Sequence, residues 1–344
     1  MRISALFVSL VAAIPIVIPS RFNRSVSRRC NNTIRGVDES EGEVMSPGYP
    51  GSYQSPSTCT LTFLGATYHR VQLIFTAFHL REPPHYVKPH ERCLHTDSVA
   101  VFNLRDNWTS QEEVDTFCGA SIPLPIMSST PGLQLLFRAE PVTSKTIMSP
   151  SVYCGFSAKF KFITNLGMLS GHQVSPGVCQ FVHRSIDAKN GTFYSPNPEG
   201  YYPQDTTCTY LFYGHQGEVV RLNFKYFDVE GVMPCDKTTD SDYLEFSNFP
   251  SADRKIPSYC GNVHPTVIQS DSSYFRVTFK SNKKFSGTGF AADYQFIDMS
   301  RQPYAIKKVM VMTAGGSKHG GTMEFIIRVA LTLATHCLLS LLCV

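Results

Sequence analysis

The stretch "GTFYSPNPEGYYPQDTTCTYLF" (191–212) has an earlier counterpart in the same chain. Residues 42–63 read "GEVMSPGYPGSYQSPSTCTLTF", and without a gap the two segments share Gly, Ser-Pro, Gly, Tyr, Thr-Cys-Thr and a final Phe. The first Cys of each half precedes the Cys of this stretch by the same interval, as Cys30–Cys59 and Cys179–Cys208. A chain of 344 residues has room for two ordinary domains, so the repeat predicts a tandem duplication.

The cysteines of both halves follow one pattern. Of the 11 Cys, Cys337 and Cys343 lie in an apolar terminal tail, and the others should mostly pair in an oxidising compartment. The simplest connectivity is local: Cys30–Cys59, Cys93–Cys118, Cys179–Cys208 and Cys235–Cys260. Each bridge would close a loop of roughly 25–30 residues, worth about 3 kcal/mol in the chain-entropy account. Cys154 has no counterpart in the second half, which leaves a buried free thiol, an intermolecular disulfide or an unassigned partner open.

Both ends of the chain have the composition of targeting segments. Residues 1–20 have Arg2 followed by an apolar run, as a secretory signal peptide does, and are excluded from the fold. Residues 325–344 form an apolar tail, preceded by a polar spacer and small residues, which is the order of a glycolipid (GPI) attachment signal near Gly315. A transmembrane anchor is the alternative. Both place the middle of the chain at the extracellular face of the plasma membrane.

Asn-x-Ser/Thr sequons agree with an extracellular location. They occur at Asn23, Asn31, Asn107 and Asn190, and we expect glycans at the last three. The net charge of +4 is spread along the chain, with no basic stripe that would indicate nucleic-acid binding.

Apolar and polar residues alternate with a period of two in both halves. Segments such as "EVVRLNFKYFDV" (218–229) and "YFRVTFKS" (274–281) are typical of half-buried strands, and turn residues separate them. Short strands at this density predict an all-β fold with one β-sandwich in each half. The predicted organisation is a first domain at 30–162, a linker at 163–178, a second domain at 179–297 and a juxtamembrane linker at 298–324.

The order of these features resembles the CUB domain. The second half has, in order, Cys179, "GTFYSPNPEGYYP", Cys208, "FDVE" (227–230), Cys235, "DYLEF" (242–246), "CG" (260–261) and "GTGFAADY" (287–294). The first half is more divergent but keeps the four cysteines, "SPGYPGSY", "DSVAVF", "CG" (118–119) and "GFSAKF". The resemblance implies two antiparallel jelly-roll β-sandwiches in tandem, stapled by disulfides.

Two CUB domains on a terminal anchor resemble the suppressor-of-lurcher and Neto type of proteins. That resemblance implies a non-enzymatic auxiliary subunit that modulates the gating or synaptic placement of an ionotropic glutamate receptor by binding its extracellular part. The alternative is a co-receptor or adhesion module for a secreted ligand or a glycan. A secreted enzyme is disfavoured because no catalytic set is found, and "HERCLH" (90–95) lacks the spacing of a zinc protease.

Many CUB domains bind Ca²⁺ through three acids, and the resemblance maps this site onto the second half. The matching positions are Glu230, Asp242 and Asn282, so an amide stands in place of the third acid. A hard cation prefers several converging oxygens, and Asn offers one neutral oxygen, so we expect a weakened Ca²⁺ site. The alternative is a solvated acidic loop in which Asp242 caps a turn.

The first half carries Arg81, Asp97 and Glu140 at the same positions. Arg81 stands where the first acid belongs, and a fixed cation opposes Ca²⁺. It is expected instead to pair with Asp97 or Glu140 as an internal substitute for the metal. The sequence therefore predicts no metal in the first domain and possible Ca²⁺ in the second.

Overall fold

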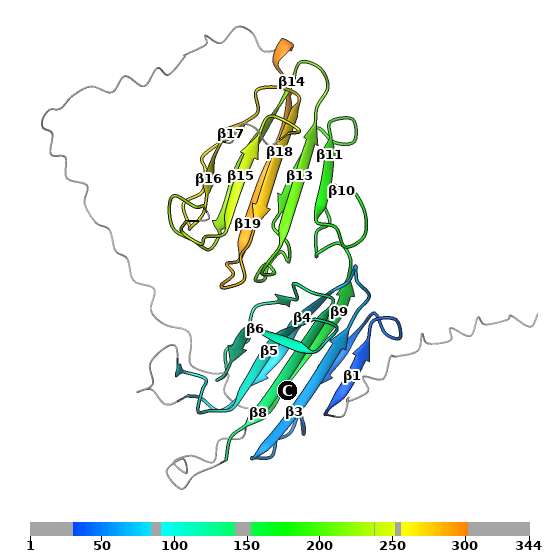
Figure 1. The fold of residues 1–344 in the computed structure, drawn as a ribbon, viewed down its shortest axis with the longest axis vertical. Coiled ribbons are helices and arrows are strands. Elements are labelled where there is room, and N and C mark those ends of the chain that lie inside the picture. Colours follow the sequence, from blue (N-terminus) through cyan, green and yellow to red (C-terminus); the bar gives the residue numbers. More distant parts are fainter. Residues whose placement is uncertain (1–29, 84–90, 142–152, 237, 252–255, 302–344) are drawn as a thin grey trace, which may run out of the picture.

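The computed structural model describes residues 30–83, 91–141, 153–236, 238–251 and 256–301. Figure 1 shows two all-β units, one built from the first half of the chain and one from the second. Each unit is a sandwich of two sheets, which confirms the predicted fold class. The predicted signal peptide, the sequon at Asn23, the attachment site at Gly315 and the tail at 325–344 lie outside the described residues. In the described part of the chain, no helix is long and apolar enough to cross a membrane.

The first unit has one five-stranded and one four-stranded sheet, in the orders β1-β3-β8-β5-β6 and β2-β9-β4-β7. The strands are β1 (Asn32–Arg35), β2 (Glu41–Met45), β3 (Ser57–Leu64), β4 (Arg70–His79), β5 (Ser98–Arg105), β6 (Ser110–Phe117), β7 (Ile126–Met127), β8 (Gly132–Ala139) and β9 (Gly155–Ile163).

The second unit repeats this plan with sheets in the orders β10-β11-β13-β18-β15-β16 and β12-β19-β14-β17. Its elements are β10 (His172–Gln173), β11 (Gln180–Arg184), β12 (Asn190–Tyr194), β13 (Thr207–Tyr213), β14 (Glu218–Asp228), β15 (Tyr243–Ser247), β16 (Ile256–Tyr259), β17 (Ile268–Gln269), β18 (Tyr274–Lys280), β19 (Gly289–Asp298) and the 3₁₀ helix η2 (Met299–Arg301).

One strand pair in each unit departs from the antiparallel arrangement that the resemblance implies. β1 runs parallel to β3, and β11 runs parallel to β13. Parallel neighbours need a crossover connection. The chain supplies it by passing through the opposite sheet, as β2 in the first unit and β12 in the second, before it returns to the first sheet.

The alternation seen in the sequence is the alternation of burial. Along β3, Cys59, Leu61 and Phe63 are buried, and the residues between them are partly exposed. Each inner face contributes to one apolar core per unit. Four disulfides follow the local pairing that the sequence predicts: Cys30–Cys59, Cys93–Cys118, Cys179–Cys208 and Cys235–Cys260. Cys154 is buried and disulfide-bonded, so it is not the free thiol that the sequence left open.

The repeated Ser-Pro dipeptide is explained by a contact with the last strand of each unit. Ser195 accepts a hydrogen bond from the Phe290 amide at 3.0 Å, and Ser46 does the same for Phe156 at 3.0 Å. The residue before each Phe is a Gly with positive φ, and a Cβ on Gly289 would lie 1.8 Å from the Ser195 hydroxyl. The Ser of the repeated Ser-Pro and the Gly-Phe that begins the last strand of each unit therefore form one contact, which requires glycine because a side chain would collide with the serine.

The segment predicted as a linker packs against the second unit. Leu166 and Met168 are buried in its core, and β10 adds to its sheet. Asn197, which is fully buried, joins the two units: its side chain accepts from Gln72 at 2.7 Å and donates to the Pro125 carbonyl at 2.9 Å.

Candidate functional site

The second unit gathers the residues that the resemblance assigned to calcium. Asp242, fully buried just before β15, accepts a hydrogen bond from the Tyr202 hydroxyl at 2.6 Å and one from the Asn282 amide at 2.6 Å. Glu230 follows β14, and its backbone N–H donates to the same Tyr202 hydroxyl at 2.9 Å. Glu230, Asp242 and Asn282 thus meet around one tyrosine.

Among the described residues, neither the Glu230 nor the Asp242 carboxylate forms an ion pair, although the Lys284 ammonium interacts electrostatically with Glu230. Burial raises the pKa of Asp242 to about 6, and the nearby Glu230 and Asp240 add to the rise, while the hydrogen bonds from Tyr202 and Asn282 oppose it. The Oε2 atom of Glu230 is buried and accepts no hydrogen bond. A buried carboxylate oxygen without a partner is costly, and a hydrogen-bond donor or a cation would reduce that cost.

Asn282 takes part with its backbone as well as its side chain. Its side-chain oxygen accepts from the Lys284 amide at 2.7 Å, and its side-chain nitrogen donates to the Asp240 carbonyl at 2.7 Å. A carbonyl oxygen has two lone pairs, so one remains. The Lys284 ammonium pairs with the Asp240 carboxylate at 2.5 Å, at the exposed edge of the cluster. No group of three or more His, Cys, Asp or Glu with metal-ligating geometry occurs among the described residues, in keeping with an amide at the third position.

The first unit has the same arrangement with a different charge. Tyr53 donates to the Asp97 carboxylate at 2.5 Å and accepts from the Arg81 amide at 3.2 Å. The Arg81 guanidinium lies 2.6 Å from the other Asp97 oxygen, with the two side chains 11% and 3% exposed. This confirms the predicted pairing of Arg81 with Asp97. Glu140 contributes backbone atoms: its amide donates to Asp97 at 2.8 Å, and its carbonyl accepts from Arg81 at 3.2 Å.

The two clusters differ mainly in the charge of one residue. Arg81 in the first unit provides a guanidinium at the position where Glu230 in the second provides an acid. Tyr53 and Tyr202 were missed as site residues by the sequence reasoning. The signal that could have found them is the Tyr that the two copies of the opening stretch share. Its burial and its bond to an acid raise the pKa of each phenol far above the usual range.

The predicted glycosylation sites are accessible. Asn31, Asn107 and Asn190 are all exposed, and the first two have left-handed backbone angles. Asn31 lies next to the Cys30–Cys59 disulfide, and its side chain accepts from Thr60 at 3.3 Å. Glycans at these three positions stay a prediction.

With this geometry in hand, the family is identified by comparison with known proteins. The family model of the CUB domain matches residues 30–159 and 179–294, so the chain belongs to the CUB-domain proteins. We refer to the two units as CUB1 and CUB2. CUB domains are typically extracellular protein-binding modules, and the disulfides agree with that location.

Several curated proteins are similar over most of this chain. Cubilin of Canis lupus familiaris is 27% identical over 256 residues, which cover 74% of this chain and 6% of cubilin. Neuropilin-1 of Homo sapiens is 27% identical over 280 residues, covering 79% and 26%. The bone morphogenetic protein 1 homolog of Strongylocentrotus purpuratus is 27% identical over 269 residues, covering 77% and 36%. The chain thus spans about a third or less of the length of these relatives.

Solved structures of CUB-containing proteins also match this chain. The CUB1-EGF-CUB2 part of rat MASP-1 has 21% identity and a TM-score of 0.30, covering 77% of this chain and 99% of that one. The MASP-1 CUB2 domain bound to Ca²⁺ has 23% identity and a TM-score of 0.29, covering 34% and 96%.

Proposed function

We propose that this protein is a non-enzymatic, membrane-tethered binding protein of the cell surface whose CUB2 domain uses Ca²⁺ to hold its partner-binding loops. The observation that carries the proposal is the unpaired acid cluster of CUB2. Glu230 has a buried oxygen without a partner, and Asp242 lies fully buried beside it. CUB1 fills the same place with a guanidinium, which supports a cation as the group that CUB2 binds there.

The residues present suit a hard cation. Glu230 and Asp242 supply carboxylate oxygens, and Asn282 supplies a carbonyl oxygen. The Tyr202 hydroxyl donates to the Asp242 carboxylate and accepts from the Glu230 backbone N–H. Oxygen ligands from loops are what Ca²⁺ prefers. A bound ion would supply positive charge that favours the ionised form of Asp242, whose pKa is raised to about 6 without it. Two acids and one amide make a site of moderate affinity, suited to an extracellular fluid rich in calcium.

The partner we propose is the extracellular part of a membrane receptor, first among them an ionotropic glutamate receptor. This rests on the resemblance to suppressor-of-lurcher and Neto proteins and on the predicted anchor. The relatives named above differ in kind, so we keep a second candidate: a co-receptor or adhesion module that binds a secreted ligand or a glycan.

The test is surface capture with a matched set of variants. The tagged full chain is expressed with a panel of ionotropic glutamate receptors and recovered with and without calcium chelation, while agonist-evoked currents are recorded. Capture with altered desensitisation, lost on chelation and in Glu230→Gln and Asp242→Asn, is the expected result. Asp38→Asn, an exposed acid outside the cluster, serves as the control. Absence of capture together with unchanged currents would refute the receptor and leave the secreted-ligand candidate.

A further inference from the structure

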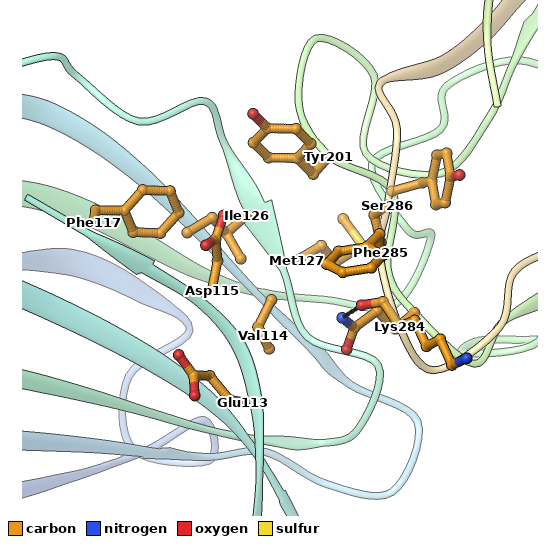
Figure 2. A pocket seen from close by; sticks show the side chains of 12 residues that line it. Glu113, Val114, Asp115, Phe117, Ile126, Met127, Tyr201, Lys284, Phe285 and Ser286 are labelled. Atoms are coloured by element: carbon orange, nitrogen blue, oxygen red, sulfur yellow. Dashed lines mark hydrogen bonds between the residues drawn. The ribbon is translucent and has the colours of Figure 1, made fainter. Parts of the chain in front are cut away.

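A cavity of about 450 Å³ lies at the junction of the two domains and borders the acid cluster described above, with which it shares Tyr202 and Lys284. Figure 2 shows its walls: Glu113, Val114 and Asp115 come from β6 of CUB1, and Tyr201 and Phe285 come from loops of CUB2. Clefts of this size at domain junctions are common binding sites.

A bulge in an edge strand brings the acids to the cavity. β6 is the last strand of its sheet, and its register with β5 shifts where Val101 faces Asp115 and Phe102 faces Glu113. Val114 is the extra residue. A bulge changes the direction of neighbouring side chains, which explains how three successive residues of one strand line the same cavity.

The carboxylates of Glu113 and Asp115 have no counter-charge within the described part of the chain. Arg105, the nearest guanidinium on the neighbouring strand β5, is engaged with Glu112 at 2.5 Å and with Asp205 of CUB2 at 3.1 Å. Lys284 lines the cavity but pairs with Asp240, and Figure 2 shows its ammonium directed away from the two acids. Asp115 is exposed and accepts a hydrogen bond from the Thr116 amide at 2.7 Å. Partial desolvation raises the pKa of its carboxyl, and the neighbouring Glu113 raises it further.

A second, independent feature of the cavity wall also calls for a hydrogen-bond donor. Gln204 is 4% exposed and lines the cavity. Its amide nitrogen donates to the Lys284 carbonyl, whereas its Oε1 atom is buried and has no hydrogen-bond partner. Because unpaired buried acceptors are rare, this oxygen indicates a donor that the free chain does not provide.

We propose that this cavity binds an arginine side chain of the protein partner. The positive charge of a guanidinium would pair with the Glu113 and Asp115 carboxylates, and its N–H groups would donate hydrogen bonds to oxygens such as that of Gln204. Its flat face stacks on aromatic rings. Tyr201 and Phe285 provide such rings, and Phe285 is 73% exposed at the cavity edge. The inference rests on the proposed role as a protein-binding protein and names the chemistry of the group that is bound.

The experiment is a titration of the full chain, in detergent and labelled with ¹³C at the methionine methyl groups. Met127 lines the cavity and reports on it, whereas Met168, buried in the CUB2 core, is the internal control. The probes are N-acetyl-arginine amide and its uncharged isostere N-acetyl-citrulline amide. Arginine should shift the Met127 signal saturably, with an affinity about tenfold above that of citrulline, the difference expected for a charge-assisted contact.

The variant Glu113→Gln/Asp115→Asn should bind the arginine probe about tenfold more weakly and no longer distinguish it from the citrulline probe. Neutralising the acids and replacing arginine by citrulline each remove the same charge-assisted contact, so the two effects should be equal. Asp38→Asn/Asp187→Asn makes the same change in charge at exposed positions outside the cavity and should bind as the unmodified chain does. Equal shifts from both probes, no shift at Met127 at high concentration of arginine probe, or full binding by the cavity variant would each overturn the proposal. Loss of receptor capture alone would not, because this titration needs no receptor.

Discussion

Replacing Glu230 by Arg should convert the CUB2 cluster into the CUB1 arrangement. In CUB1 the Arg81 guanidinium lies 2.6 Å from Asp97, and Tyr53 holds the acid from the other side. CUB2 has the same tyrosine–aspartate pair, Tyr202 and Asp242. An arginine at position 230 should therefore pair with Asp242, remove one of the two like charges that face it and make the domain independent of calcium.

The magnitude follows from the pKa of Asp242, which rises from 3.8 to about 6 in the folded domain. Each unit corresponds to 1.36 kcal/mol, so the ionised acid costs the calcium-free domain about 3 kcal/mol at neutral pH. Because the folded pKa is the higher one, this cost appears as pH rises through 6 and is absent below 3.8. Glu230→Arg should recover most of it, and the neutral Glu230→Gln a smaller part.

Hydrogen exchange of β18 (Tyr274–Lys280) provides the assay, since this central strand reports the stability of CUB2 alone. In chelator, Glu230→Arg should protect the strand more than the unmodified chain does, and added Ca²⁺ should change nothing. The unmodified chain should gain about 2.7 kcal/mol when Ca²⁺ reaches a hundred times its dissociation constant. A Glu230→Arg variant that is less protected than the unmodified chain in chelator, or that still responds to Ca²⁺, would refute the reasoning.

Three further predictions concern other contacts. Arg81→Met should destabilise CUB1 by about 3–5 kcal/mol, because Asp97 is left buried without its partner. Trp108 fluorescence during denaturation measures the free energy of unfolding, and the double variant Arg81→Met/Asp97→Asn should recover part of the lost stability. His183 is buried with neither ring nitrogen hydrogen-bonded, and burial lowers its pKa from 6.5 to about 4. Its contribution to stability is therefore fully present above pH 6.5 and falls by about 3 kcal/mol as pH drops through 4. His183→Phe should remove this pH dependence from hydrogen exchange measured against pH, and an unchanged profile would contradict the prediction. Asn197→Gly keeps the positive φ at this position but removes the side-chain hydrogen bonds to Gln72 and Pro125 that join the domains. The domains should then separate, and small-angle scattering should find a larger radius of gyration. An unchanged radius would show that other contacts hold the domains together.

The cysteine spacing and the period-two alternation were sufficient to predict two β-sandwiches and their local disulfides, because both patterns are set by short-range geometry. The motifs also placed Glu230, Asp242 and Asn282 together. The parallel pairing of β1 with β3 was not predictable from alternation, since a strand reads the same in either direction. Tyr202 was missed because its hydroxyl reaches Asp242 only after the two sheets close on each other.

The cavity between the domains was beyond the sequence for the same reason. Its walls come from β6 and from two loops more than eighty residues away, and only the packing of CUB1 on CUB2 brings them together. Gln204 gives no signal in the sequence, because its unpaired oxygen is a property of its surroundings.

The ion pair between Arg81 and Asp97 also has a consequence for how the molecule matures. A charge that is part of the chain is present from the moment of synthesis, whatever the ionic composition of the compartment, and no chelator can withdraw it. CUB1 therefore completes its charge balance with its own residues. If CUB2 binds a cation as proposed, its charge balance instead depends on the concentration of a dissolved ion, so one copy of the duplication would respond to the surrounding solution and the other would not.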